Sequence, residues 1–422
     1  MSRLFLILLP AAVLLPFFHV GGWGFSLRLE VVAAAVLSVS WWAGFSLRGK
    51  LLFTEEARLL VWFAGLLILI SVSVLVAIVF LGYAPSARDL SELLRVIVYG
   101  ALLWLGVVFR RRQITPSRVA ACFLGAAVLA VFVGFLQYFD CFGINNWLTP
   151  LYTGAQLRGV VVQQRIIGTF SNPNEFGAFL VLPAAISLGT ILLSDRPACR
   201  VLCWMLLTIF AVGVILTGSR TAVASLLIMV LTVLLLAAPR VATAARVLRT
   251  VIGVLLGCAV ALSVVWIVGP SQPIQRFGEI ADVRRAGSWQ GRVEDWSNDL
   301  DAWFASPITG WGPGEADMES TVDNEWLLIM RRYGILGLIW FVIGGVAVLV
   351  ALSGVLRRAQ SLTGKVLATA LIGVIPAYAF YMIFAAVYHA PQLMPPLLLV
   401  VGVALADRHS NSHRTYGAIR CT

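Results

Sequence analysis

The sequence predicts an all-α integral membrane protein with about twelve transmembrane helices and one large helical loop outside the membrane. Its 422 residues are 60% hydrophobic and only 12% charged, whereas soluble proteins carry about 25% charged residues. Apolar runs of about 17–25 residues recur along the chain, and each is long enough to cross a bilayer as a helix. Backbone groups in lipid need internal hydrogen bonds, and the alternating pattern of a membrane barrel is absent, so these runs predict helices.

The twelve predicted spans divide the chain into four parts. Residues 1–268 hold the first nine spans, 269–324 form the large loop, 325–407 hold the last three spans, and 408–422 form a tail. The predicted spans are 4–20, 29–47, 59–83, 93–109, 119–139, 175–193, 199–216, 221–238, 247–268, 333–356, 366–388 and 391–407.

The placement of basic residues predicts the orientation. If the N-terminus is cytoplasmic, 19 of the 31 basic residues fall on the cytoplasmic side, as the positive-inside rule expects. Both termini are then cytoplasmic, and the 269–324 loop lies outside. The net charge of +11 is therefore a topology signal and does not indicate nucleic-acid binding. The 19 residues are Arg3, Arg48, Lys50, Arg58, Arg110, Arg111, Arg112, Arg118, Arg196, Arg200, Arg240, Arg246, Arg249, Arg357, Arg358, Lys365, Arg408, Arg414 and Arg420.

The first helix, the cysteines and the histidines do not indicate a signal peptide, a disulfide framework or a metal site. The first span lacks a small-residue cleavage site before Gly21, so it is predicted to be a retained helix and not a signal peptide. The six cysteines do not predict a disulfide framework, and none lies in the large loop. The four histidines show no metal-ligand spacing. We therefore assign no metal and no cofactor.

Residues 288–304 of the large loop predict an amphipathic helix. Trp and other apolar residues recur there at spacings of three and four, with acids between them. The helix could pack its Trp face on the membrane domain or lie among lipid headgroups. It could equally be a lid over an outward-facing cavity. The apolar residues are Trp289, Val293, Trp296, Leu300, Trp303 and Phe304.

Arginines on the outer side are informative because that side usually avoids basic residues. Arg158 and Arg165 precede the segment Ser171–Glu175, whose residue types predict a helix N-cap. Arg220 lies in the tight turn 217–221, where a hairpin needs Gly and Ser but not Arg. An ionisable group at this depth suggests function, and the alternative for Arg220 is snorkelling to headgroups.

Arg292 and Asp323 would complete the candidate site. Arg292 lies on the amphipathic helix, where an ion pair with Asp295 or a cation–π contact with a Trp is the local alternative. If Arg165, Arg220 and Arg292 converge, their guanidinium groups suit the oxygens of a lipid-linked pyrophosphate. Asp323 could act as general base for an attacking sugar hydroxyl, or merely cap the next helix.

Three segments together resemble the O-antigen ligase and polymerase superfamily of bacterial envelope glycosyltransferases. They are RIIGTFSNPNEFGAFL at 165–180, TGSRTA at 217–222, and GRVEDWSNDLDAWFASPITGWGPG at 291–314 followed by DNEWLLIMRRYGILGL at 323–338. The twelve-helix topology with a large late periplasmic loop is similar as well. The resemblance is specific over about 165–340.

The resemblance implies an inverting, metal-independent transfer of glycan from an undecaprenyl-pyrophosphate carrier at the periplasmic face of the bacterial inner membrane. By motif, Arg165, Arg220 and Arg292, with Arg158 nearby, would hold the pyrophosphate, and Arg220 and Arg292 would stabilise it as leaving group. Asp323 would face the acceptor. The residues expected beside it on the acceptor side are Asn324, Glu325 and Glu319.

One departure from the family pattern favours a polymerase of O-antigen or exopolysaccharide repeat units. Ligases that transfer O-antigen to lipid A-core typically carry His-Asn where this chain has Asp323-Asn324. The ligase remains an alternative, as does a change of acceptor or base. A transporter or flippase for lipid-linked glycan is the alternative of another class; few charges in the spans and the lack of a visible repeat argue against it. Expected partners are the undecaprenyl-pyrophosphate-linked glycan, membrane lipid, and a chain-length regulator or other envelope polysaccharide proteins.

Overall fold

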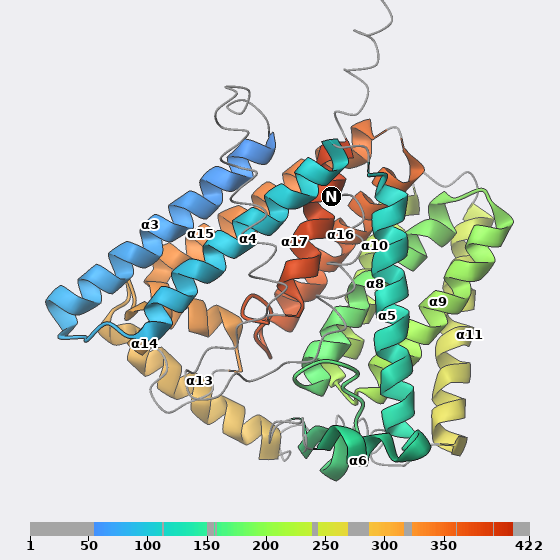
Figure 1. Cartoon of the computed structure of the whole chain (residues 1–422), viewed down its shortest axis with the longest axis horizontal. Coiled ribbons are helices and arrows are strands. Elements are labelled where there is room, and N and C mark those ends of the chain that lie inside the picture. The colour runs from blue at the N-terminus through green and yellow to red at the C-terminus, as the bar shows by residue number, and fades with distance from the viewer. Residues whose placement is uncertain are drawn as a thin grey trace, which may run out of the picture.

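The computed structural model places most of the chain in a bundle of long helices (Figure 1). It describes residues 55–111, 114–149, 156, 158–238, 244–268, 287–315, 323–359, 361–390 and 392–407. Within these ranges every regular element is helical. The predicted spans at 4–20 and 29–47, residues 269–286 and 316–322 of the predicted loop, and the predicted tail at 408–422 lie outside the described residues.

Each predicted span within the described ranges corresponds to a helix. Eight of the described helices are long and apolar enough to cross a membrane, and α17 is a shorter apolar helix. The membrane-protein class is therefore confirmed. The helices are α3 (Glu55–Leu81), α4 (Ala87–Arg111), α5 (Pro116–Tyr138), α8 (Pro173–Leu193), α9 (Pro197–Leu216), α10 (Arg220–Ala237), α11 (Ala244–Val268), α15 (Glu325–Arg358), α16 (Leu362–Tyr381) and α17 (Met394–Ala406).

Helix α8 lies at the centre of one half of the bundle, packed against α9, α10 and α16. Without a hydrophobic driving force in lipid, helices associate through close packing, which small residues permit. Gly177 shows this, because a Cβ there would lie 2.7 Å from the Cβ of Ala222 on α10. The Tyr378 hydroxyl on α16 also donates to the Ala178 carbonyl, at 3.1 Å. The first turns of α8 are thus fixed against α10 and α16.

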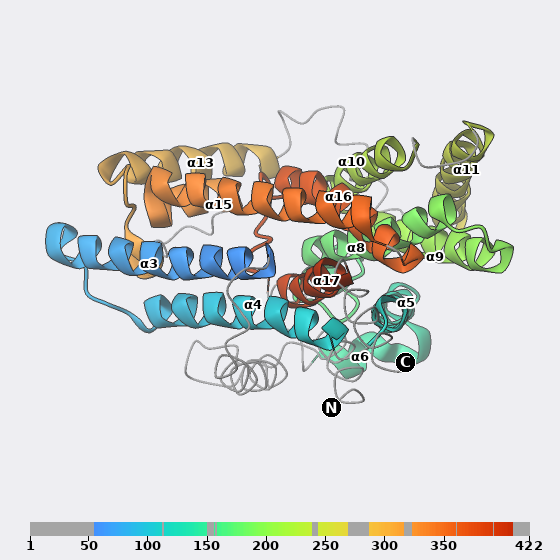
Figure 2. The same cartoon turned by 90° about the horizontal axis from the view of Figure 1, so that it is seen from above.

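The other half of the bundle is formed by α3, α4, α15 and α17 (Figure 2). Helix α3 packs between α15 and α4, and α4 packs along α17. Two short helices from the two long loops, α6 (Ile144–Leu148) and α13 (Gly287–Ala305), lie along the same edge of the molecule in Figure 1. The described helices of the two loops therefore lie at the same end of the bundle.

Helix α15 is broken near its start, at Gly334 (φ 63°). A Cβ at this position would lie 2.1 Å from the Ile308 carbonyl oxygen, so only glycine fits. The break frees backbone groups that need other partners. The Ile335 amide donates to the Pro307 carbonyl at 2.8 Å, and the Ser73 hydroxyl donates to the Arg332 carbonyl at 2.8 Å. The first turns of α15 thus form a short, separately oriented segment that carries Glu325 and Arg332.

The amphipathic helix predicted at 288–304 is confirmed as α13, but its predicted apolar face is only partly covered. Trp289 and Trp296 stack edge to face with centroids 5.8 Å apart, and Trp296 lies 6.2 Å from Phe384. Val293 and Phe304, by contrast, are exposed. The Trp side of α13 therefore contacts the membrane domain, whereas the exposed apolar residues face away from protein.

Four buried charged residues lie just before two of the predicted spans, 93–109 and 333–356. Glu92 on α4 and three residues on α15 are buried, and all four lie near the outer ends of their helices. They escape a hydropathy scan because each falls at the edge of an otherwise apolar run. The buried residues on α15 are Glu325, Arg331 and Arg332.

Candidate functional site

The turn between α9 and α10 places Arg220 at the start of a helix. Gly218 adopts a left-handed conformation (φ 60°), which glycine tolerates best. Ser219 is the N-cap, and its hydroxyl accepts from the Ala222 amide at 3.3 Å. Arg220 is therefore the first residue of α10, beside backbone dipoles that favour an anion.

Arg165 is buried and held rigidly against the same turn. Its Nε donates to the Thr217 carbonyl at 2.5 Å, and its Nη2 donates to Asn174 Oδ1 at 2.7 Å. Its Nη1 donates to Gln163 Oε1 at 3.0 Å. The absence of a Cβ at Gly218 leaves room for the side chain, which would otherwise lie 3.4 Å from that atom. Arg165 thus joins the loop before α8 to the turn before α10.

The N-cap predicted for α8 is confirmed and belongs to Asn172. Its Oδ1 accepts from the Glu175 amide at 2.9 Å, while Glu175 Oε1 accepts from Asn172 Nδ2 at 2.8 Å. Asn174, one of the other candidate caps, orients Arg165 instead. Helix capping therefore explains Asn172 but does not explain Arg165.

Arg292 on α13 reaches the membrane domain from the loop. Its Nε lies 3.5 Å from Asp323 Oδ2, and its Cζ lies 5.9 Å from the centroid of Phe384. The partners suggested by sequence, Asp295 and a neighbouring Trp, are thus replaced by residues distant in the chain. Phe384 follows α16, so Arg292 links α13 to the outer end of that helix.

Arg165, Arg220 and Arg292 line one small pocket of about 50 Å³. The first turn of α10, Asn174, Tyr381 and Phe384 complete its walls. Three guanidinium groups and a helix N-terminus facing one cavity suit an anion with several oxygens. Two other predicted site residues cannot be placed in the pocket. The structure does not describe the side chain of Arg158, and Glu319 lies outside the described residues.

Asp323 does not line this pocket but contacts Arg292, which does, and its side chain is 55% exposed. The alternative that Asp323 caps α15 is wrong, because the cap is Asn324, whose Oδ1 accepts from the Trp326 and Leu327 amides at 3.0 and 3.2 Å. The Asp323 carboxylate is therefore accessible and tied only to Arg292 among the contacts described.

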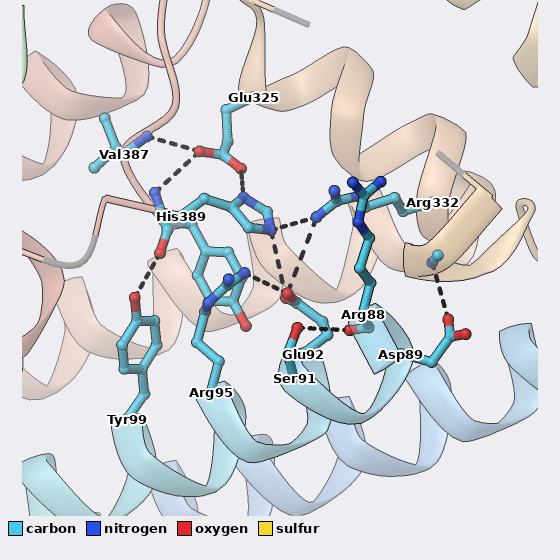
Figure 3. A network of polar contacts seen from close by, with 12 residues as sticks. Arg88, Asp89, Ser91, Glu92, Arg95, Tyr99, Glu325, Arg332, Val387 and His389 are labelled. Carbon is cyan, nitrogen blue, oxygen red and sulfur yellow. Dashed lines mark hydrogen bonds and ion pairs between the residues drawn. The ribbon is translucent and has the colours of Figure 1, made fainter. Parts of the chain in front are cut away.

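Glu325 is fully buried in a polar network that sequence reasoning missed (Figure 3). Its Oε2 accepts from the Val387 and Tyr388 amides at 2.7 and 3.0 Å, and its Oε1 lies 2.5 Å from His389 Nδ1. Its own amide donates to the Met382 carbonyl at 2.8 Å. Glu325 thus fixes the loop between α16 and α17, which carries Phe384 into the pocket.

The network continues from His389 to α4. His389 Nε2 lies 3.4 Å from Glu92 Oε1 and 2.6 Å from Arg332 Nη1. Arg95, one turn after Glu92, pairs with the Glu92 carboxylate. Two buried carboxylates thus meet two guanidinium groups, which offsets the cost of burying each charge. The only signal in the sequence is the presence of charges at predicted helix ends; nothing there brings residue 92 to residue 389.

A second buried ion pair fixes α13 to α15. Asp299 Oδ1 lies 2.7 Å from Arg331 Nη1, and both side chains are buried. Burial raises the pKa of Asp299 above its ordinary value although Arg331 opposes the shift. Desolvation therefore outweighs the attraction, as is common for buried ion pairs.

We expect replacement of Asp299 alone to detach α13, because the buried ion pair that joins α13 to Arg331 on α15 would be lost. Asp299→Ala should weaken the docking of α13 by about 3–5 kcal/mol, seen as faster proteolysis within α13 in detergent-solubilised protein. The double variant Asp299→Leu/Arg331→Met should restore resistance. Equal resistance of wild type and Asp299→Ala would contradict this role.

Comparison with known proteins gives one family. Residues 204–342 match the family model described as O-Antigen ligase. The matched stretch includes Arg220, Arg292 and Asp323 but not Arg165. The predicted resemblance to the O-antigen ligase and polymerase superfamily is therefore confirmed. No curated protein matches the chain.

A solved structure also matches the chain. It is described as "Structural coordination of polymerization and crosslinking by a peptidoglycan synthase complex". The likeness has a TM-score of 0.43 at 18% sequence identity, and it covers 82% of this chain and 98% of the other.

Proposed function

We propose that this relative of the O-antigen ligases is a glycosyltransferase that polymerises undecaprenyl-pyrophosphate-linked repeat units at the periplasmic face of the inner membrane. The observation that carries the proposal is the convergence of Arg165, Arg220 and Arg292 on one pocket. These arginines come from three separate segments, each within one of the motifs that resemble the family. The exposed carboxylate of Asp323 lies beside one of them.

In the proposed reaction the arginine pocket binds the donor pyrophosphate. Arg165, held by three hydrogen bonds, presents a preorganised charge, and Arg220 and Arg292 stabilise the negative charge that grows on the leaving pyrophosphate. The acceptor hydroxyl attacks the anomeric carbon from the opposite side. The new glycosidic bond forms as the bond to the pyrophosphate breaks, so the anomeric configuration inverts. No step requires a metal or cofactor in this scheme.

Asp323 acts as general base and takes the proton of the acceptor hydroxyl. Its exposure allows an acceptor sugar to reach it, and its carboxylate lies 3.5 Å from Arg292 Nε. Asn324 and Glu325 serve the acceptor side indirectly, because they are buried and hold the start of α15 and the loop carrying Phe384. A chain-length regulator would be a separate protein that binds near this site.

We expect Asp323→Asn to abolish extension while leaving the protein in the membrane. In cells, the variant should leave single repeats on the final acceptor, because polymerisation stops but downstream transfer continues. Gel separation of the glycans provides the measurement, with Asp301→Asn, an exposed acid on α13, as control. Long polymer accumulating on the carrier would instead support the ligase alternative, and a normal ladder would contradict a base role for Asp323.

A further inference from the structure

A large apolar groove lies between α3, α4, α15, α16 and α17, on the side of α16 away from the arginine pocket. Its volume is about 360 Å³, within the range of about 300–1,000 Å³ typical of ligand sites. Its wall is almost entirely apolar and rich in aromatic rings, including Trp62, Phe63, Tyr99 and Phe341. Because these residues lie within membrane spans, the chemistry fits a hydrocarbon chain.

The outer end of α16 separates the groove from the arginine pocket. Tyr378, Ala379 and Met382 line the groove, whereas Tyr381 and Phe384 line the arginine pocket. A single lipid with its pyrophosphate on Arg220 would have to cross the end of α16 to place its chain in the groove. The groove therefore suits a different lipid from the one held by the arginines.

The groove approaches the acceptor side of the site. Trp326, which lines it, is one helical turn from Asp323, and its indole Nε1 donates to the Ala379 carbonyl at 3.0 Å. A chain emerging here would deliver its head group next to the Asp323 carboxylate. The position thus matches the substrate that Asp323 is proposed to deprotonate.

Along one face of α4 the side chains change from apolar, where they line the groove, to charged. Leu103 and Tyr99 line the groove, and the same face continues outward at spacings of three and four through Arg95 and Glu92 to the exposed Arg88. The Tyr99 hydroxyl donates to the Tyr388 carbonyl at 2.8 Å and marks the boundary between the two zones. An apolar chain in the groove would therefore place its polar end near this charged zone, in which Arg95 pairs with Glu92.

We propose that this groove binds the polyisoprenoid chain of the lipid-linked acceptor. The inference rests on the proposed polymerase function and deepens it, since it assigns separate lipid sites to the donor and the acceptor. The apolar wall, rich in aromatic rings, provides contacts for a branched, unsaturated chain. Trp326, three residues after Asp323 in the chain, lies at the end of the groove that would face the acceptor. Donor and acceptor then meet across the end of α16.

Gly345 offers a clean way to block the groove. It lines the groove, and a Cβ added there would meet no atom within 4 Å, so Gly345→Leu would extend into open space. Gly125 on α5 also has no atom within 4 Å of an added Cβ and does not line the groove. Gly125→Leu is therefore a matched control with the same substitution in a membrane helix.

The test uses full-length protein in phospholipid vesicles with one donor and two acceptors, the same repeat on a long polyisoprenyl chain or on a short alkyl chain. We expect Gly345→Leu to raise KM for the long-chain acceptor about tenfold, because the burial of at least two methylene groups is lost. KM for the donor and for the short-chain acceptor should stay within twofold of Gly125→Leu. A photoreactive polyisoprenyl phosphate should label the groove in wild type and much less in Gly345→Leu.

The other outcomes overturn the inference in distinguishable ways. Kinetics of Gly345→Leu equal to those of Gly125→Leu would remove the groove from acceptor binding, and an equal rise in donor KM would assign it to the donor chain. Labelling abolished by excess phosphatidylglycerol would identify an ordinary lipid site. If wild type forms no glycosidic bond yet is labelled in the groove, the proposed function fails and not the lipid site.

Discussion

Arg220→Ala should reduce the rate of chain extension about 10²–10³-fold, the usual effect of removing one preorganised group that stabilises developing charge. Arg220 is the first residue of α10 and faces the same pocket as Arg165 and Arg292. Its loss removes positive charge where the pyrophosphate leaves. The measurement is the initial rate of extension of lipid-linked repeats by purified protein in vesicles.

The charge and the geometry of Arg220 can be separated by a second variant. Arg220→Lys keeps the charge but loses the planar fork that binds two oxygens, so its rate should fall between those of wild type and Arg220→Ala. Arg118→Ala, which removes an exposed arginine in the first turn of α5, should extend chains normally. Wild-type rates from well-folded Arg220→Ala protein would contradict the pyrophosphate site.

Glu325→Ala should lower the free energy of unfolding by about 3–5 kcal/mol, the cost of removing one partner from a buried charged pair. Two backbone amides and His389 would lose their acceptor. The expected result is a lower midpoint in denaturant or thermal unfolding of detergent-solubilised protein. Asp301→Ala, at an exposed acid, is the control.

A double variant tests whether the effect comes from the network. Glu325→Ala/His389→Ala should cost less than the sum of the two single changes, because each partner is already lost in the other's absence. Additive costs would show that Glu325 and His389 act independently. A Glu325→Ala protein as stable as Asp301→Ala would contradict a structural role for the buried carboxylate.

Local features of the fold could be predicted from sequence because they depend on short stretches of chain. Apolar runs predict the helices from α3 to α17, and N-cap residue types predict the start of α8 at Asn172. The spacing of three and four between Trp and other apolar residues, with acids between them, predicts α13. The candidate arginines could be selected because the charge pattern predicts that they lie on the side that usually avoids basic residues.

Features that depend on distant contacts could not be predicted. Glu92 meets His389 across almost 300 residues, and no local pattern encodes that distance. The break at Gly334 requires the Ile308 carbonyl to pass within 2.1 Å of the missing Cβ, which only the packed loop shows. Arg292 has nearby acids and Trp residues as plausible partners, yet its observed contacts are Asp323 and Phe384.

The most direct measurement is extension of undecaprenyl-pyrophosphate-linked single repeats by purified protein in sealed vesicles. Our account predicts chains longer than one repeat and release of one undecaprenyl pyrophosphate for each bond formed, with both products strongly reduced in Arg220→Ala. Movement of the intact lipid-linked repeat across the vesicle membrane, without chain growth or carrier release, would contradict the account and support a transporter.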